Sequence, residues 1–116
     1  PALARMGSVG SAGGKYIGVR VMPREAIIHR QIIDHLRSLG AWVFKVHGSP
    51  YQTVGVPDLL VGYRGRFYGM EVKQPGKKLS PVQAKVIEDI RASGAIAGRV
   101  ESVEEAVALL DEYVPE

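Results

Sequence analysis

Two acidic side chains, Asp58 and Glu71, are spaced so that they would face each other across a β-hairpin. The pair Arg64-Gly65 lies midway between them, and a Gly-containing pair suits a tight two-residue turn. With Arg64 and Gly65 at the centre of that turn, Asp58 and Glu71 lie directly opposite each other, with Cβ atoms roughly 5 Å apart. Lys73, two residues beyond Glu71, points to the same face of the hairpin.

Opposed carboxylates repel each other, so a compensating cation is expected between them. Hard oxygen ligands suit Mg²⁺ or Mn²⁺, and Mg²⁺ is usually held by one or two carboxylates while waters and phosphate oxygens fill its other positions. An ammonium group beside such an ion stabilises charge that develops on a phosphate, or positions the attacking water. The two acids and the lysine therefore predict hydrolysis of a phosphodiester bond.

A cluster of surface salt bridges is the alternative interpretation, with the two acids paired to Lys73 or to the hairpin arginines Arg64 and Arg66. The other face of the hairpin favours the metal site instead. That face is largely apolar and is expected to pack on the core; it carries Leu59, Val61, Tyr63, Tyr68, Met70 and Val72. Small and apolar residues also flank the acids on their own face, which indicates a partly covered cleft.

Pro57-Asp58 together with Glu71-Val72-Lys73 resembles the signature of the PD-(D/E)XK nucleases. The span from Glu25 to about Leu110 resembles the VRR-NUC branch of that superfamily, the virus-type replication-repair nucleases. A Glu that opens the preceding helix, Gly-Val before Pro-Asp, and a Ser-Pro-x-Gln helix start after the lysine support the resemblance. It implies a restriction-endonuclease-like core, and it adds the backbone carbonyl of Val72 and the side chain of Glu25 to the expected metal ligands.

Glu25 and Gln83 occupy positions that spacing alone explains in two ways. Glu25 lies three and seven residues before Ile28 and Ile32 on the buried stripe of a predicted helix, yet the helix dipole also favours an acid in a first turn. Gln83 lies three residues after Ser80 and completes a capping box. A supporting role for Gln83 at the active site comes only from the resemblance.

The three histidines have no metal-ligand spacing among them. His29 and His35 are interpreted as residues on a helix surface. His47 is interpreted as a loop residue, with a contact to DNA or water at the cleft as the alternative.

Four basic residues are candidates for contacts with DNA phosphates. Lys77 and Lys78 lie in a basic turn after the predicted catalytic lysine, and Arg64 and Arg66 lie at the tip of the hairpin. The simpler alternative for each of them is a solvated loop. The formal net charge of +3 suits a polyanionic partner, and the surface is more basic than this total because several acids are assigned to the metal site.

Composition indicates one soluble globular domain. The chain has 116 residues with 46% hydrophobic residues, enough for a single layered core, and no apolar run approaches the roughly 20 residues needed to span a bilayer. It has no cysteine, which excludes disulfides and thiolate metal sites and fits an intracellular, cytoplasmic protein. Residues 1–21 are expected to be a flexible leader or a remnant of protein expression, and 22–116 the nuclease-like domain.

Periodicity and turn signals predict the order helix, three strands, helix, strand, helix. The predicted helices span residues 24–39, 81–93 and 103–113, and the predicted strands span 41–46, 58–63, 67–74 and 96–100. The first three strands form an antiparallel meander, and the middle helix is the crossover that brings the fourth strand parallel to the third. We therefore expect an α/β fold with a mixed four-stranded sheet flanked by helices.

The residues and the resemblance together predict a DNA endonuclease that depends on Mg²⁺ or Mn²⁺. The resemblance implies a single-domain phage or prophage nuclease whose relatives cleave branched DNA as homodimers, in the manner of Holliday junction resolvases, within a bacterial or phage-infected cell. A nickase or flap nuclease that ignores branch structure is one alternative. A non-catalytic nucleic-acid-binding or assembly module that keeps the nuclease fold is the other.

Overall fold

The computed structural model describes residues 23–48 and 54–112, which form an α/β fold. In chain order its elements are α2 (Arg24–Ser38), β1 (Trp42–Lys45), β2 (Leu59–Tyr63), β3 (Arg66–Val72), α3 (Pro81–Ala92), β4 (Ile96–Val100) and α4 (Val103–Leu110). The predicted order of elements is confirmed. The leader expected at residues 1–21 lies outside the described residues.

The element boundaries differ from the prediction mainly at the ends. β3 stops at Val72, and α4 ends at Leu110 instead of continuing to about residue 113. The backbone N–H groups of Asp111 and Glu112 turn back to the carbonyls of Val107 and Leu109, which closes the last turn of α4. No glycine marks this end in the sequence, so the pattern overestimated the length of the helix.

The sheet is mixed, with the strand order β1-β2-β3-β4. β1, β2 and β3 are antiparallel, and β4 is parallel to β3. Leu59 pairs with Met70 and Tyr63 with Arg66, which is the register predicted for a turn centred on residues 64 and 65. Both turn residues have positive φ, 51° for Arg64 and 80° for Gly65, as a type I′ hairpin turn requires.

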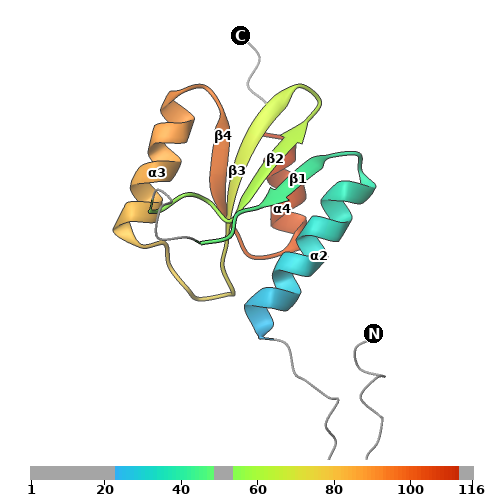
Figure 1. Ribbon diagram of the computed structural model, residues 1–116, viewed down its shortest axis with the longest axis horizontal. Coiled ribbons are helices and arrows are strands. Elements are labelled where there is room, and N and C mark those ends of the chain that lie inside the picture. Colours follow the sequence, from blue (N-terminus) through green and yellow to red (C-terminus); the bar gives the residue numbers. More distant parts are fainter. Residues whose placement is uncertain (1–22, 49–53, 113–116) are drawn as a thin grey trace, which may run out of the picture.

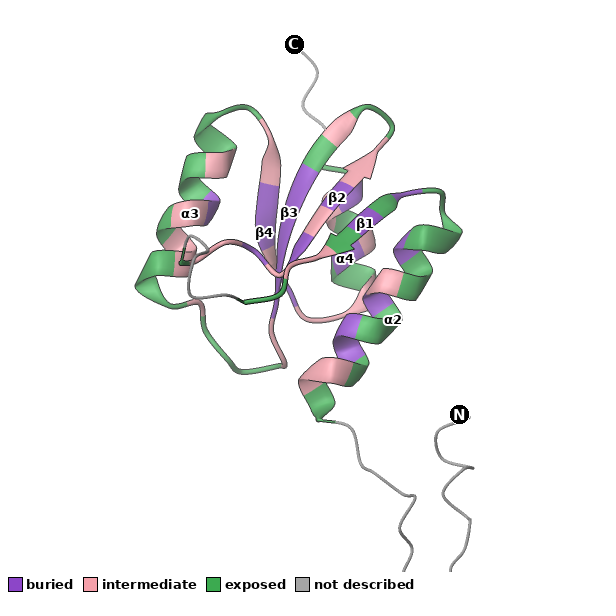
Figure 2. Ribbon diagram, in the orientation of Figure 1, coloured by how far each residue is buried: buried purple, intermediate pink, exposed green. Residues whose placement is uncertain are grey.

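Helices cover both faces of the sheet (Figure 1). α2 and α4 pack on one face, and α3, the crossover between β3 and β4, packs on the other. The main core lies between the sheet and the pair α2 and α4, as the buried segments in Figure 2 show. Its members are aliphatic residues of α2 and α4 together with the face of β2 and β3 predicted to be apolar: Ile28, Ile32, Leu36, Leu59, Val61, Tyr68, Met70, Val72, Ala106 and Leu110.

Local capping interactions define where the helices begin and end. At the start of α3, Ser80 and Gln83 form the predicted capping box, in which each side chain accepts a hydrogen bond from the backbone N–H of the other. At the end of α2, Gly40 has a φ of 95°, and the N–H of Ala41 donates to the carbonyl of Leu36. This left-handed glycine ends the helix and turns the chain into β1.

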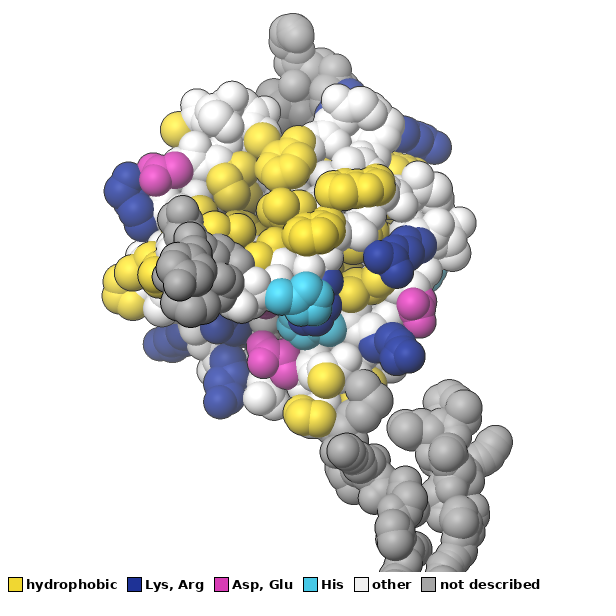
Figure 3. All heavy atoms as spheres, viewed as in Figure 1, with side chains coloured by type: hydrophobic (Ala, Val, Ile, Leu, Met, Phe, Trp, Pro, Cys, Tyr) yellow, Lys and Arg dark blue, Asp and Glu magenta, His cyan; other side chains and the backbone are white. Residues whose placement is uncertain are grey.

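The α3 face of the sheet is only partly covered. Trp42 and Phe44 of β1 stack on each other with a 6.1 Å separation of ring centroids, and together with Phe67 of β3 they remain exposed where α3 does not reach. Figure 3 shows hydrophobic side chains gathered on this side of the molecule. Among the described residues, no helix is long and apolar enough to cross a membrane.

Candidate active site

Two glycines and a proline place Asp58 at the start of β2. Gly55 lies against α3, where a Cβ atom would come within 2.6 Å of Val82 Cγ1. Pro57 is fully buried and packs over Gly69 of β3, whose missing side chain makes room for the ring. The loop before β2 is therefore held between α3 and the sheet, and this explains why Gly-Val-Pro precedes the acid.

Asp58 is then fixed by the backbone of the neighbouring strand. Its Oδ2 accepts a hydrogen bond of 3.0 Å from the N–H of Val72. In an extended strand the N–H and the C=O of one residue point to the same side. The carbonyl of Val72 consequently points toward the side on which Asp58 lies, as its predicted role as a ligand requires.

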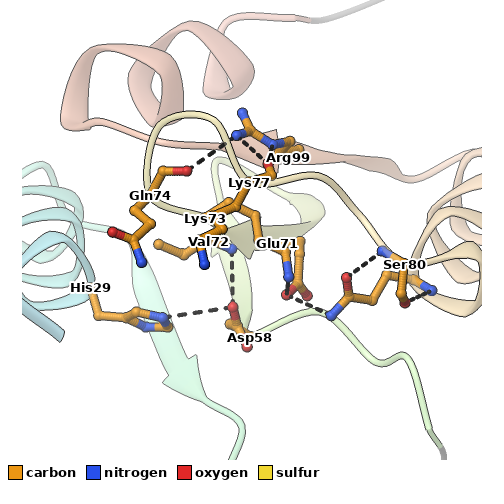
Figure 4. Close-up of polar contacts among 10 residues, drawn as sticks. His29, Asp58, Glu71, Val72, Lys73, Gln74, Lys77, Ser80 and Arg99 are labelled. Carbon is orange, nitrogen blue, oxygen red and sulfur yellow. Dashed lines mark hydrogen bonds and ion pairs between the residues drawn. The ribbon is translucent and has the colours of Figure 1, made fainter. Parts of the chain in front are cut away.

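Glu71 lies on the same face of the hairpin and is almost completely buried, with 3% of its surface exposed. Its Oε2 accepts a 3.1 Å hydrogen bond from Gln83 Nε2 and lies 3.8 Å from Lys73 Nζ (Figure 4). Its Oε1 is buried and has no hydrogen-bond partner within the described residues. A buried carboxylate oxygen without a partner is costly, so this atom indicates a missing ligand.

Burial and, after it, the negative charge of Asp58 raise the pKa of Glu71 to about 7, against the opposing effect of Lys73. The carboxyl therefore carries a proton part of the time near neutral pH in the metal-free protein. A divalent cation between Asp58 and Glu71 would replace that proton and would remove the repulsion.

Glu25 does not stand next to these two acids. It is half-buried in the first turn of α2, one turn before His29, whose pKa is lowered by burial and by Lys45 against the weaker opposing effects of Asp58 and Glu25. Within residues 23–48 and 54–112, no group of three or more His, Asp or Glu side chains is arranged to hold a metal ion by itself. The predicted role of Glu25 as a ligand stays a prediction.

Gln83 connects the start of α3 to Glu71. Its Oε1 accepts a hydrogen bond of 2.9 Å from the N–H of Ser80, while its Nε2 donates to Glu71. The capping interaction thus fixes the amide so that its donor side faces the acid. The two roles proposed for Gln83, as a cap and as a supporting residue, are compatible in one conformation.

His29 was predicted to lie on the helix surface, and this prediction is wrong. The residue is 8% exposed, with Nε2 3.6 Å from Asp58 Oδ2 and Nδ1 3.3 Å from Lys45 Nζ. Desolvation and the charge of Lys45 lower the pKa of His29, so the imidazole is neutral at neutral pH. A signal was present in the sequence, because His29 lies three and seven residues before Ile32 and Leu36 on the buried stripe.

The candidate DNA-binding residues lie in two separate places. Lys77 and Lys78 are exposed on the turn that follows Lys73, at the end of the sheet that carries the acids. Arg64 and Arg66 lie at the hairpin tip, toward the opposite end of the sheet; Arg66 is five strand residues, or roughly 16 Å, from Glu71. The guanidinium of Arg64 stacks over the ring of Tyr63 at 5.1 Å.

Arg99 holds the turn that carries the two lysines, and the sequence did not reveal this role. Arg99 is the partner of Glu71 across β3 and β4. Its Nε and NH2 atoms donate to the carbonyl of Lys77 at 2.9 and 2.6 Å, and NH1 pairs with Glu101 at 2.9 Å. The turn is therefore fixed through its backbone, whereas its lysine side chains extend into solvent.

The donor set fits a hard divalent cation. Asp58 and Glu71 supply carboxylate oxygens, one of them buried without a partner, and Val72 supplies a carbonyl on the same side. These are the oxygen donors that Mg²⁺ and Mn²⁺ prefer, and the site contains no thiol. Asp58, with 31% of its side chain exposed, leaves the site open to solvent.

The raised pKa of Glu71 predicts how the stability of the metal-free protein depends on pH. The folded-state pKa of about 7 exceeds the unfolded value of 4.5, so the folded chain binds more protons between these values. The contribution of Glu71 to the free energy of unfolding is fully present below about pH 4.5. It is lost as the pH rises through 7, which lowers the free energy of unfolding by an amount on the order of 1–3 kcal/mol. Urea unfolding in EDTA at pH 5, 6, 7 and 8 measures it.

Glu71→Gln, which cannot ionise, should remove this fall and should be more stable than the wild type at pH 8. Glu88→Gln, an exposed change on α3, is the matched control and should keep the wild-type dependence. The comparison of wild type with variant cancels the opposite contribution of His29, whose lowered pKa makes stability rise with pH. If the free energy of unfolding changed with pH in the same way for the wild type and for Glu71→Gln, the pKa of Glu71 would not be raised in the folded protein.

No family model matches the sequence, and no curated protein is significantly similar to it. A solved structure described as a VRR_NUC domain is similar, with a TM-score of 0.67 and 28% identity over 80% of this chain and all of that chain. A second is Hjc, a Holliday junction resolvase from the archaeal hyperthermophile Archaeoglobus fulgidus. Its TM-score is 0.53 and its identity 21%, over 66% of this chain and 67% of that chain, a likeness of fold alone.

The resemblance predicted from the sequence is thus confirmed: the chain has the fold of a VRR_NUC domain, with a restriction-endonuclease-like mixed sheet between helices.

Proposed function

We propose that the chain is a Mg²⁺- or Mn²⁺-dependent endodeoxyribonuclease that hydrolyses phosphodiester bonds. The observation that carries the proposal is the opposed pair of acids, in which Glu71 is buried and its Oε1 has no partner within the described residues while Lys73 lies 3.8 Å from Oε2. A structural module without chemistry has no reason to place two carboxylates opposite each other with one of them buried. The similarity to a VRR_NUC domain supports the same reading.

Asp58, Glu71 and the carbonyl of Val72 would hold the ion. Glu25 would face it through ordered water, since Mg²⁺ keeps several of its waters and Glu25 does not join the other acids in a ligand group. When bound, the ion would supply positive charge to the phosphate and would lower the pKa of the attacking water.

Lys73 and Gln83 act on the two sides of Glu71. The ammonium of Lys73 is a donor only, so beside the acids it donates to a phosphate oxygen or to the attacking water. Gln83 fixes the orientation of the Glu71 carboxylate by its 3.1 Å hydrogen bond. In the reaction the water oxygen forms a bond to phosphorus, and the bond from phosphorus to one sugar oxygen breaks.

Branched DNA is the proposed substrate class, and a homodimer is the proposed active form. Hjc, which shares the fold, is a Holliday junction resolvase. Paired cuts in a four-way junction need two sites related by symmetry, and closed two-fold dimers are the commonest arrangement of identical chains. Lys77 and Lys78, and more remotely Arg64 and Arg66, would contact the phosphates of the arms.

The catalytic assignment predicts different effects for Asp58 and Lys73. Asp58→Asn should abolish cleavage and should also remove the rise in melting temperature that Mn²⁺ causes, because a ligand is lost. Lys73→Met should lower the cleavage rate at least about 100-fold while Mn²⁺ affinity stays within a few-fold, since an ammonium is not a ligand. Cleavage assays on junction, nicked and linear DNA, with calorimetric Mn²⁺ titration, measure both.

A wild-type chain that neither cleaves any of these DNAs nor responds to Mn²⁺ would support the non-catalytic module instead. Near-normal cleavage by Asp58→Asn would show that the metal site lies elsewhere.

The basic turn predicts a salt-dependent contribution to binding. Replacing Lys77 and Lys78 together by Ala should weaken binding to all DNA sequences alike and reduce the slope of log affinity against log salt by about 1–2, because phosphate contacts release counterions. Fluorescence anisotropy at several salt concentrations measures the slope. Lys85→Ala is the control, since Lys85 pairs with Asp89 on the outer surface of α3. An unchanged slope in the double variant would place the DNA path elsewhere.

The dimer is tested by light scattering at micromolar concentration, alone and with junction DNA. A mass of two chains is expected in both conditions. A monomer that makes single nicks without preference for branches would exclude the paired-cut resolvase and leave the nickase alternative.

A further inference from the structure

His29 is a buried polar residue that the proposed chemistry has not used. It comes from α2 and approaches Asp58 from a different direction than the Val72 backbone (Figure 4). Its two ring nitrogens contact two different charged groups, Lys45 Nζ at 3.3 Å and Asp58 Oδ2 at 3.6 Å. The three residues form a chain of contacts from β1 through α2 to the start of β2.

Lys45 determines which ring nitrogen of His29 carries the proton. An ammonium group has only donors, and a neutral imidazole has one donor and one acceptor. Nδ1 faces the ammonium, so Nδ1 is the acceptor and the proton lies on Nε2, toward Asp58. In this tautomer Nε2–H is a donor that faces Asp58.

Two of the contacts of the Asp58 carboxylate fall on the same oxygen, Oδ2. The N–H of Val72 lies 3.0 Å from Oδ2, and the N–H side of His29 faces that oxygen from α2. The Val72 hydrogen bond at 3.0 Å and the His29 contact at 3.6 Å lie on one oxygen and together restrict the orientation of the carboxylate. Groups that orient a metal-binding carboxylate in this way typically change metal affinity about 10-fold to 100-fold when they are removed.

We propose that His29 is a positioning residue: its Nε2–H, directed by Lys45, orients the Asp58 carboxylate for metal binding. The proposal rests on the proposed function, because it assumes that Asp58 binds the ion. It adds to the proposed metal ligands two residues that do not bind the ion, His29 of α2 and Lys45 of β1, which are linked to Asp58 through the imidazole ring of His29. Lys45 acts on Asp58 only through His29.

Two substitutions of His29 distinguish the effect of its N–H donor on Mn²⁺ affinity from the effect of its side-chain volume. His29→Gln keeps an N–H donor within reach of Asp58, and His29→Leu keeps only apolar volume. Mn²⁺ affinity, measured by calorimetry on the metal-binding wild type and variants, should fall about 10-fold in His29→Leu and recover most of that loss in His29→Gln. His35→Leu, an exposed change on the same helix, should leave Mn²⁺ affinity unchanged.

Lys45→Met tests the effect of the ammonium group on His29 while the imidazole ring itself stays in place. In the metal-free protein, ¹⁵N NMR of the imidazole should show the Nε2–H tautomer of His29, and Lys45→Met should weaken that preference and Mn²⁺ affinity together. In His29→Leu, adding Lys45→Met should cause no further loss, because Lys45 acts through the ring. The NMR measurement decides the question even where a His29 variant does not fold.

Wild-type Mn²⁺ affinity in His29→Leu, an equal loss in His29→Gln and His29→Leu, or an Nδ1–H tautomer would each overturn the proposal. These outcomes differ from a failure of the proposed function, in which the wild type itself binds no Mn²⁺ and cleaves no DNA.

Discussion

The repulsion between two carboxylates is the constraint on which the rest of this structure depends. Asp58 and Glu71 face each other across β2 and β3, and Glu71 is buried. Such a pair is unfavourable without a cation, so the surrounding chain has to hold it in place. Gly55, Pro57 and Gly69 do so by packing the loop before Asp58 between α3 and the sheet, at positions where a larger side chain would collide.

Side chains from different elements then complete the environment of the pair. α3 contributes Gln83, whose amide is fixed by the cap of its own helix before it reaches Glu71. α2 contributes His29, β3 contributes the backbone of Val72, and Lys73 follows directly after the end of β3. Each of these groups is held by an interaction that also stabilises the fold. The interactions that form the fold therefore also place the side chains around the two acids.

Sequence patterns predicted the parts of the site that are set by local geometry. The Arg64-Gly65 turn has one preferred hairpin geometry, so the opposition of Asp58 and Glu71 followed from counting residues. His29 and Arg99 act through contacts with residues distant in the chain, and the patterns did not predict their roles. The spacing of His29 relative to Ile32 and Leu36 did indicate burial, but its partner on the loop before β2 depends on how α2 packs on the sheet.

The way Arg99 holds the turn after β3 bears on how this fold can change during evolution. The guanidinium binds carbonyl oxygens of Gln74 and Lys77, and every residue type provides a backbone carbonyl. The turn can therefore keep its shape while its exposed side chains are exchanged. Selection could alter the exposed surface of this turn without disturbing Asp58 and Glu71 nearby. Proteins that share this scaffold would then diverge in the substrates they prefer sooner than in the reaction they catalyse.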